Sequence, residues 1–291
     1  MLAHLVRRYL PATAAALTSL PAMAQGTATG APNDLRDPLL TPPNERYTLR
    51  FEPSAFFAAP GGKLRLAGSP IGGDTVRLEN LDLDVPRISP FVELHLRSDN
   101  WRFSVSGFET SLHDRGSVQL QSGQIGTLLY NPGDQLTSSM NFGTGEVVVA
   151  RELGAPDSIS GKKDPDFSVG FEAYGGFRFY DVSFDIRGPG GSVNADEFFV
   201  QPIVGVKTTM SIIDRFTFDV QLGVGGFMEG AGKHSHSFDI LVGFMYRPTT
   251  NLGVQIGYRL FIYDLQDGPA TERFEYRGAV AGLYGGLVLR F

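Results

Sequence analysis

The chain has 291 residues, of which 19% are charged, and its formal net charge is -6. No cluster of Lys and Arg appears beyond the N-terminus, so the basic surface that a nucleic-acid partner requires is absent. The chain contains no cysteine, which excludes disulfides, thiolate metal sites and cysteine nucleophiles. Its 36 Gly, 22 Phe and 10 Tyr favour a β-rich protein with many turns.

Residues 1–24 have the parts of a secretory signal peptide. A basic start precedes an apolar stretch, Leu10–Leu20, and the cleavage pattern A-x-A ends at Ala24. A membrane-anchoring helix is the alternative, but the stretch is short and is interrupted by prolines. We expect cleavage after Ala24, a disordered Pro- and Gly-rich segment over 25–44, and a folded domain over 45–291.

Apolar and polar residues alternate with a period of two through the folded domain, which is the pattern of β-strands. The alternation is clearest over 166–184, 216–225, 237–247, 252–263 and 279–291, and weaker over 46–57, 91–97, 101–107 and 199–210. Residues 143–152 also form a predicted strand, although its facing cannot be assigned. A tilted strand crosses a bilayer with roughly 9–11 residues, so segments of this length can span a membrane.

The connections between these segments alternate in length. Short turns at 98–100, 211–214 and 248–251 alternate with long polar connections at 58–87, 110–136, 187–197 and 266–277. Short turns at one rim and long loops at the other are typical of outer-membrane barrels. Aromatic residues near the short turns predict an interfacial girdle: Trp101, Phe103, Phe167, Phe216, Phe218, Tyr246 and Phe291.

These patterns predict an all-β fold, a transmembrane antiparallel up-and-down β-barrel of about ten strands, with eight or twelve as alternatives. A soluble β-sandwich would also alternate, but it would not account for the connections and the girdle. We expect the chain to be exported and inserted into the cell outer membrane. The last segment, 281–291, would close the barrel against the first strand with its apolar side towards lipid.

The C-terminal half of the chain resembles a group of poorly characterised Gram-negative, proteobacterial outer-membrane barrels. The resemblance rests on Pro202, Gly205 and Lys207, on the Gly223–Phe227 and Gly257–Arg259 segments, and on a terminus with Gly282, Gly286, Leu287 and Phe291. It covers roughly 167–291, and the terminus departs from the usual Gly-Pro at Val280-Ala281. It implies the fold, the location and an assembly signal at Phe291, and it brings no catalytic residues.

Charged residues of both signs fall on the predicted inward face of the barrel. They are Glu93, His95, Arg97, Arg102, Glu172, Arg178, Lys207, Asp219, Asp239, Arg259 and Arg290. Inward positions of a membrane barrel are commonly polar, so a structural network of paired charges is the main interpretation. The functional alternative is a narrow pore. Inward glycines such as Gly205, Gly223, Gly243 and Gly257 would leave room for some water, and they would equally serve strand curvature and close packing.

Two groups of residues near the predicted outer rim are the sharpest enzymatic candidates. His234 and His236 precede Asp239 in a predicted outer loop, and His113 and Asp114 lie in another. Omptin-type surface proteases are ten-stranded barrels with His and Asp residues at the outer rim, and lipid A deacylases use a Ser/His pair in the barrel wall. Their chemistry needs a base within hydrogen-bonding reach of water or a hydroxyl. We expect solvated loops here, and neither a catalytic nor a metal site.

The sequence therefore predicts a non-enzymatic integral outer-membrane barrel, either structural or a small passive pore. A surface hydrolase of the omptin or lipid A-modifying type is one alternative, and an adhesion or interaction barrel acting through its outer loops is another. The expected partners are outer-membrane lipid and lipopolysaccharide, the barrel-assembly machinery and periplasmic chaperones. No cofactor is expected, and the oligomeric state is left open.

Overall fold

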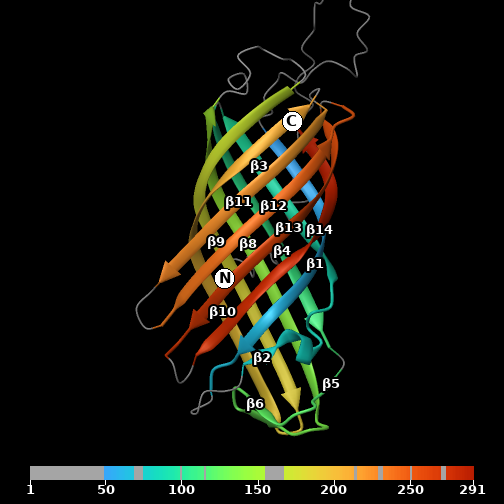
Figure 1. Cartoon of the computed structure of the whole chain (residues 1–291), viewed down its shortest axis with the longest axis vertical. Coiled ribbons are helices and arrows are strands. Elements are labelled where there is room, and N and C mark those ends of the chain that lie inside the picture. Colours follow the sequence, from blue (N-terminus) through green and yellow to red (C-terminus); the bar gives the residue numbers. More distant parts are fainter. Residues whose placement is uncertain are drawn as a thin grey trace, which may run out of the picture. The chain divides into compact units, whose positions relative to one another are not determined.

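A computed structural model describes residues 49–68, 75–98, 100–114, 116–154, 167–212, 215–228, 232–249, 251–269 and 273–291 (Figure 1). The predicted signal peptide and the segment 25–44 lie outside the described residues. Ten long strands dominate the described chain: β1 (Leu49–Arg65), β3 (Arg87–Ser98), β4 (Trp101–His113), β8 (Gln135–Gly154), β9 (Phe167–Gly188), β10 (Gly191–Ile212), β11 (Phe216–Met228), β12 (His234–Tyr246), β13 (Leu252–Asp267) and β14 (Phe274–Arg290). The shorter elements are β2 (Val76–Arg77), the 3-10 helix η3 (Leu78–Leu81), β5 (Ser117–Val118), β6 (Gly123–Ile125) and β7 (Leu128–Tyr130).

The ten long strands form a closed antiparallel barrel. Their order around the wall is β1-β3-β4-β8-β9-β10-β11-β12-β13-β14, and β14 pairs back with β1 from Arg50↔Arg290 to Arg65↔Glu275. The backbones of Leu49 and Phe291 extend this closing seam with two hydrogen bonds of 3.1 and 2.9 Å. The predicted fold class and strand number are confirmed, and the alternatives of eight and twelve strands are wrong.

Side chains point alternately into and out of the barrel because successive residues of a strand face opposite sides. In β13 the outward Leu252, Val254 and Ile256 are exposed, whereas the inward Gly253 and Arg259 are buried. The predicted facing also holds in β9, β11, β12 and β14. Exposed Leu, Val, Ile and Phe therefore cover the outside of the wall, a surface suited to lipid.

No helix in the described part of the chain is long and apolar enough to cross a membrane.

Both ends of the described chain and the short turns share one end of the barrel, called the turn end below. Here β3 meets β4 after Ser98, β10 meets β11 after Ile212, and β12 meets β13 after Tyr246. The predicted girdle residues Trp101, Phe103, Phe167, Phe216, Phe218 and Phe291 are exposed, and Tyr246 is half-buried. The Phe216 and Tyr246 rings stack with centroids 5.1 Å apart.

The opposite end, called the loop end, differs from the prediction. The strands run further than expected, to Arg65 in β1, His113 in β4 and Asp267 in β13, so the connections are shorter. The predicted long connection over 187–197 is wrong, because β9 and β10 continue to a tight turn and pair as far as Gly188↔Gly191. Gly191 adopts a φ of 131° at this turn, a conformation that glycine accepts readily, and the Gly-rich stretch permits the reversal.

The lumen near the loop end is filled by an aromatic and aliphatic core. Its largest fully buried apolar side chains are Phe56, Phe91, Phe142, Tyr180, Phe184, Phe199, Phe261, Phe274 and Tyr276. The connecting segments add Leu78 and Leu81 from η3, and Ile125 and Leu128 from β6 and β7, to the same core. The barrel is thus packed inside as well as paired around its wall.

Candidate functional site

The charged cluster of the lumen is the candidate functional site. All eleven predicted inward residues are buried or half-buried. Ten of them lie along strands β3, β4 and β9–β13: Glu93, His95, Arg97, Arg102, Glu172, Arg178, Lys207, Asp219, Asp239 and Arg259. Arg290 is half-buried, and its backbone N–H donates to Asn251 at the turn end. The structure adds three buried members that the sequence did not reveal: Arg50, Glu52 and Glu146.

A four-residue cluster links strands across the lumen. Arg178 on β9 donates from Nη2 to Glu146 Oε2 at 2.7 Å and to Asp239 Oδ2 at 2.9 Å. Arg259 on β13 donates from Nη2 to the same Asp239 oxygen at 2.7 Å. The guanidinium of Arg178 also lies 4.6 Å from the Phe261 ring centroid. Two cations and two carboxylates therefore neutralise one another at the centre of the barrel.

Two further groups of ion pairs lie nearer the turn end. Arg97 and Arg102 donate to the two carboxylate oxygens of Glu172 at 2.6 and 2.7 Å. Lys207 Nζ lies 3.3 Å from Asp219 Oδ2, and the Thr209 hydroxyl donates to the other Asp219 oxygen at 2.6 Å. These contacts pair charges that the sequence places on the inward face.

Glu52, Glu93 and His95 have the ligand types of a metal centre, with donor atoms within 4.8 Å of one another. The His95 Nε2 atom lies 3.1 Å from Glu52 Oε1, and its Nδ1 atom lies 2.7 Å from the Ser104 hydroxyl. However, the guanidinium of Arg50 already contacts the same Glu52 oxygen. Because this guanidinium already neutralises the Glu52 carboxylate, the arrangement fits a paired charge better than a metal site.

Aromatic rings from opposite walls meet in the lumen, on the loop-end side of the charged cluster. Strands β8 and β13 are diametrically opposed, because β9, β10, β11 and β12 separate them one way and β4, β3, β1 and β14 the other. Phe142 on β8 nevertheless stacks on Tyr263 of β13, with centroids 4.9 Å apart. The equally opposed β9 and β14 bring Phe184 and Tyr276 to 5.3 Å. These contacts therefore span the barrel at this level.

The inward glycines Gly205, Gly223, Gly243 and Gly257 are closely packed, which is the second of the two roles that the sequence leaves open for them. A Cβ atom added at Gly205 or Gly223 would overlap the side chain of Tyr174. Tyr284 covers Gly243 and Gly257 in the same way. The Tyr174 hydroxyl donates to the Leu222 carbonyl at 3.2 Å and accepts from Gln221 at 3.3 Å. The volume that the glycines leave is thus occupied by tyrosine rings.

The predicted rim residues do not form one site. His234 and His236 lie in strand β12, not in a loop, and belong to its outward-facing set with ring centroids 5.8 Å apart. Their partner Asp239 belongs to the inward set, on the other side of the wall. His113 ends β4 on the opposite side of the barrel, because five ladder steps separate β4 from β12 in either direction. Asp114 follows His113, and its backbone N–H donates a hydrogen bond to the Ser138 carbonyl.

No protein-family model matches the chain, and no curated protein matches its sequence. Solved structures with a similar fold are outer-membrane barrels of Gram-negative bacteria. The outer membrane protease OmpT from Escherichia coli has a TM-score of 0.41 and 10% identity, covering 85% of this chain and 99% of that one. The translocator domain of autotransporter NalP from Neisseria meningitidis has 0.43 and 12%, covering 85% and 90%. Neisserial surface protein A has 0.30 and 13%, covering 84% and 97%.

Proposed function

We propose that this protein is a non-enzymatic integral barrel of the outer membrane, with a closed lumen and a structural role in the cell envelope. The turn end would face the periplasm and the loop end the outside, the usual arrangement of bacterial barrels. The apolar outer wall supports membrane insertion. The observation that carries the closed lumen is the stacking of Phe142 on Tyr263 from diametrically opposite strands.

The lumen chemistry also favours a structural role over a hydrolase. General acid–base catalysis needs a group that can exchange a proton with a bound substrate. The central carboxylates Glu146 and Asp239 are instead held by Arg178 and Arg259 and are buried. The rim histidines on β12 and the one on β4 lie on opposite sides of the barrel, too far around the wall to act together.

Conductance in planar lipid bilayers tests the closed lumen. We expect no single-channel steps from the wild-type protein, because two layers of contacts join β8 to β13: the Phe142–Tyr263 stack and the approach of Arg259 Nη2 to Glu146 Oε2 at 3.8 Å. The positive control replaces these four residues and the Phe184–Tyr276 pair with serine, which removes the contacts between opposed strands described above and should give steps. Insertion of each protein is checked by heat-modifiable migration in gels. Regular steps from the wild type would contradict the proposal.

An interaction role for the loop end is a second candidate. Val118, Leu120 and Leu129 in and beside β5 and β7 are exposed apolar side chains, with Leu120 87% exposed. Such residues on an outer surface are typical of contact sites when they occur together. Serine at Leu120 and Leu129 should leave the barrel folded and reduce aggregation of cells that display it. Unchanged aggregation would contradict an adhesive role for this segment.

A further inference from the structure

Two opposite sides of the barrel differ in charge at the loop-end border of the apolar wall. One side, called the basic face below, is formed by the outward residues of β1 and β14. The other, called the acidic face, is formed by the outward residues of β9 and β10. Five ladder steps in either direction separate β1 from β10, and also β14 from β9, so the two faces point in opposite directions.

On the basic face, three exposed cations stand side by side across neighbouring strands. Lys63 of β1 lies directly opposite Arg277 of β14 and Arg77 of β2. Carboxylates of this chain lie near both arginines, at 2.8 and 3.1 Å from Arg277 and at 3.9 Å from Arg77, whereas Lys63 forms no ion pair with any described residue. Like charges directly opposite each other in a sheet are destabilising, so the row favours a carboxylate from outside the chain beside Lys63.

The acidic face has carboxylates at the matching place on the wall. On β9 the outward Phe177 and Phe179 are followed towards the loop end by Asp181. On β10 the outward Phe198 is followed by Asp196 in the same way, and neither carboxylate forms an ion pair with a described residue. The cations of the basic face also come directly after the last apolar outward residues of β1 and β14. Since this border marks the membrane surface, the opposite charges lie at one level.

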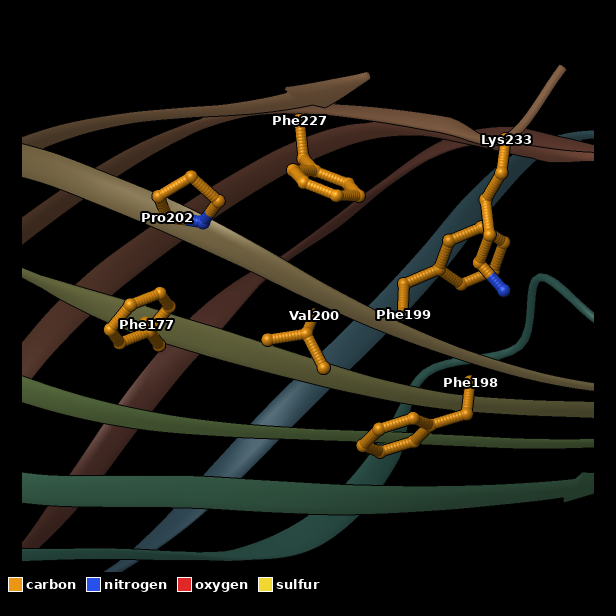
Figure 2. A pocket seen from close by; sticks show the side chains of 7 residues that line it. All are labelled: Phe177, Phe198, Phe199, Val200, Pro202, Phe227 and Lys233. Atoms are coloured by element: carbon orange, nitrogen blue, oxygen red, sulfur yellow. The ribbon is translucent and has the colours of Figure 1, made fainter. Parts of the chain in front are cut away.

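The acidic face is hollowed by a pocket of about 270 Å³, which opens where the β10–β11 pairing ends at Ile203↔Gly225 (Figure 2). Its outward lining residues are Phe177, Phe198, Val200 and Pro202, and the others are Phe199, Phe227 and Lys233. The volume is just below the roughly 300 Å³ at which sites for drug-sized molecules begin, and the lining is mostly apolar. The pocket therefore suits one large apolar side chain.

The basic face carries a side chain that fits this hollow. Phe57 is 51% exposed, and its outward neighbours along β1 are alanines on both sides, so its ring projects from the wall. Phe57 and Lys63 are as far apart along β1 as Pro202 and Asp196 are along β10, with the charged residue nearer the loop end in both strands. A Phe57 ring in the pocket of a second copy would thus bring Lys63 to Asp196.

We propose that copies of this protein associate side by side in the membrane, with the basic face of one copy on the acidic face of the next. Phe57 fills the neighbour's pocket, and Lys63 pairs with Asp196 and Asp181 at the membrane surface. Copies in one membrane share their orientation, so opposite faces at one level meet by translation alone. The contact is heterologous and repeats into open rows, not closed dimers. It does not depend on whether the lumen conducts, so it is tested separately from the closed lumen.

Disulfide cross-linking tests this contact, because the chain contains no cysteine of its own. Gly61→Cys places a thiol between Phe57 and Lys63, where an added Cβ meets no atom within 4 Å. Ser183→Cys places one on β9 directly opposite Asp196. After oxidation in phosphatidylcholine vesicles, the double variant should give a ladder of dimers, trimers and larger species. Each single variant should stay monomeric, and a mixture of the two should stop at the dimer.

A matched control combines Gly61→Cys with Ser111→Cys, an exposed outward position of β4 outside the acidic face. It should give only the cross-linking of random collisions. A test pair that cross-links no more than this control, or a single variant that forms dimers by itself, would overturn the proposal. A ladder that needs added lipopolysaccharide would also overturn it, because lipid phosphates and not the acidic face would then neutralise the basic row.

Charge reversal tests the pairing directly. Lys63→Glu in the double-cysteine protein should lower the cross-linked fraction by about tenfold, because it brings like charges together across the contact. Adding Asp181→Lys and Asp196→Lys should restore the ladder. Phe57→Ala, which leaves the neighbour's pocket empty, should also lower the fraction. A ladder that is insensitive to both Lys63→Glu and Phe57→Ala would show that other surfaces make the contact, and the proposal would be wrong.

Discussion

Removing Arg178 should destabilise the barrel more than removing any exposed arginine. Its side chain is 2% exposed and its guanidinium donates to Glu146, Asp239 and Ser237. Arg178→Met would leave two buried carboxylates with Arg259 as their remaining cation in this cluster. Breaking a buried pair by deleting one partner costs about 3–5 kcal/mol, so we expect a loss of this size in the free energy of unfolding.

The chain offers a matched control at Arg187. It forms a similar pair with Asp185, at 2.7 Å between Nη2 and Oδ2, but its side chain is 69% exposed. Exposed ion pairs contribute about 0–1 kcal/mol, so Arg187→Met should change the stability little. Both variants are compared by urea titration of the protein reconstituted in lipid vesicles, with the fluorescence of Trp101 as the reporter of unfolding.

A double variant separates loss of a cation from loss of packing. Adding Glu146→Gln to Arg178→Met removes one of the stranded charges, so it should recover part of the lost stability. If Arg178→Met and Arg187→Met cost the same, or if the second substitution makes the first worse, the cluster is not held by charge compensation. The argument from buried ion pairs would then be refuted.

Three other predictions concern the wall, the rim and the closing seam. Ile256→Arg should destabilise the reconstituted barrel by about 2–4 kcal/mol in the same titration, because a charge replaces an outward apolar side chain, whereas Ile256→Leu should not. Equal effects of the two substitutions would mean that this face does not contact lipid. Alanine at both His234 and His236 should leave stability and conductance unchanged, since both residues lie on the outward face of β12. Loss of a measurable protease or deacylase activity in this variant would contradict the non-enzymatic proposal. Phe291→Tyr should assemble normally, whereas Phe291→Asp should reduce the amount of protein recovered in the outer-membrane fraction, because the exposed ring lies at the girdle where Phe291 pairs with Leu49. Equal recovery of the two variants would contradict a role for the aromatic ring.

The period-two pattern is sufficient to predict the wall of this barrel. It assigns an outward and an inward set to each strand, and the assignments for β9, β11, β12, β13 and β14 agree with the structure. Where the pattern weakens, so does the prediction. In 143–152 the run Val147-Val148-Val149-Ala150 is apolar on both sides because inward Val148 and Ala150 pack in a small core with Tyr174 and Ile203, so Glu146 could not be placed in the lumen.

The loop end was harder to predict because its residues satisfy two demands at once. Residues 187–197 are rich in Gly, Asn, Asp and Ser, a composition typical of loops. Their inward positions nevertheless hold Val193 and Ala195, which pack against the core, while the polar residues Asn194 and Asp196 lie outside the apolar part of the wall. A strand that projects beyond the membrane has polar outward residues, and composition alone cannot distinguish it from a loop.

Whether the lumen is open depends on which residues share a row across neighbouring strands, and that is set by the register. Gly205 pairs with Tyr174 on one side and with Gly223 on the other, so the tyrosine ring extends along the row over both glycines. The arrangement recurs three strands further around the wall, where Gly257 lies between Tyr284 and Gly243. Sequence shows the inward glycines but not their row partners, and a glycine beside a glycine would indicate space. A glycine pair with an inward tyrosine in the same row indicates packing instead, so the register turns the feature that favoured a pore into one that favours a closed barrel.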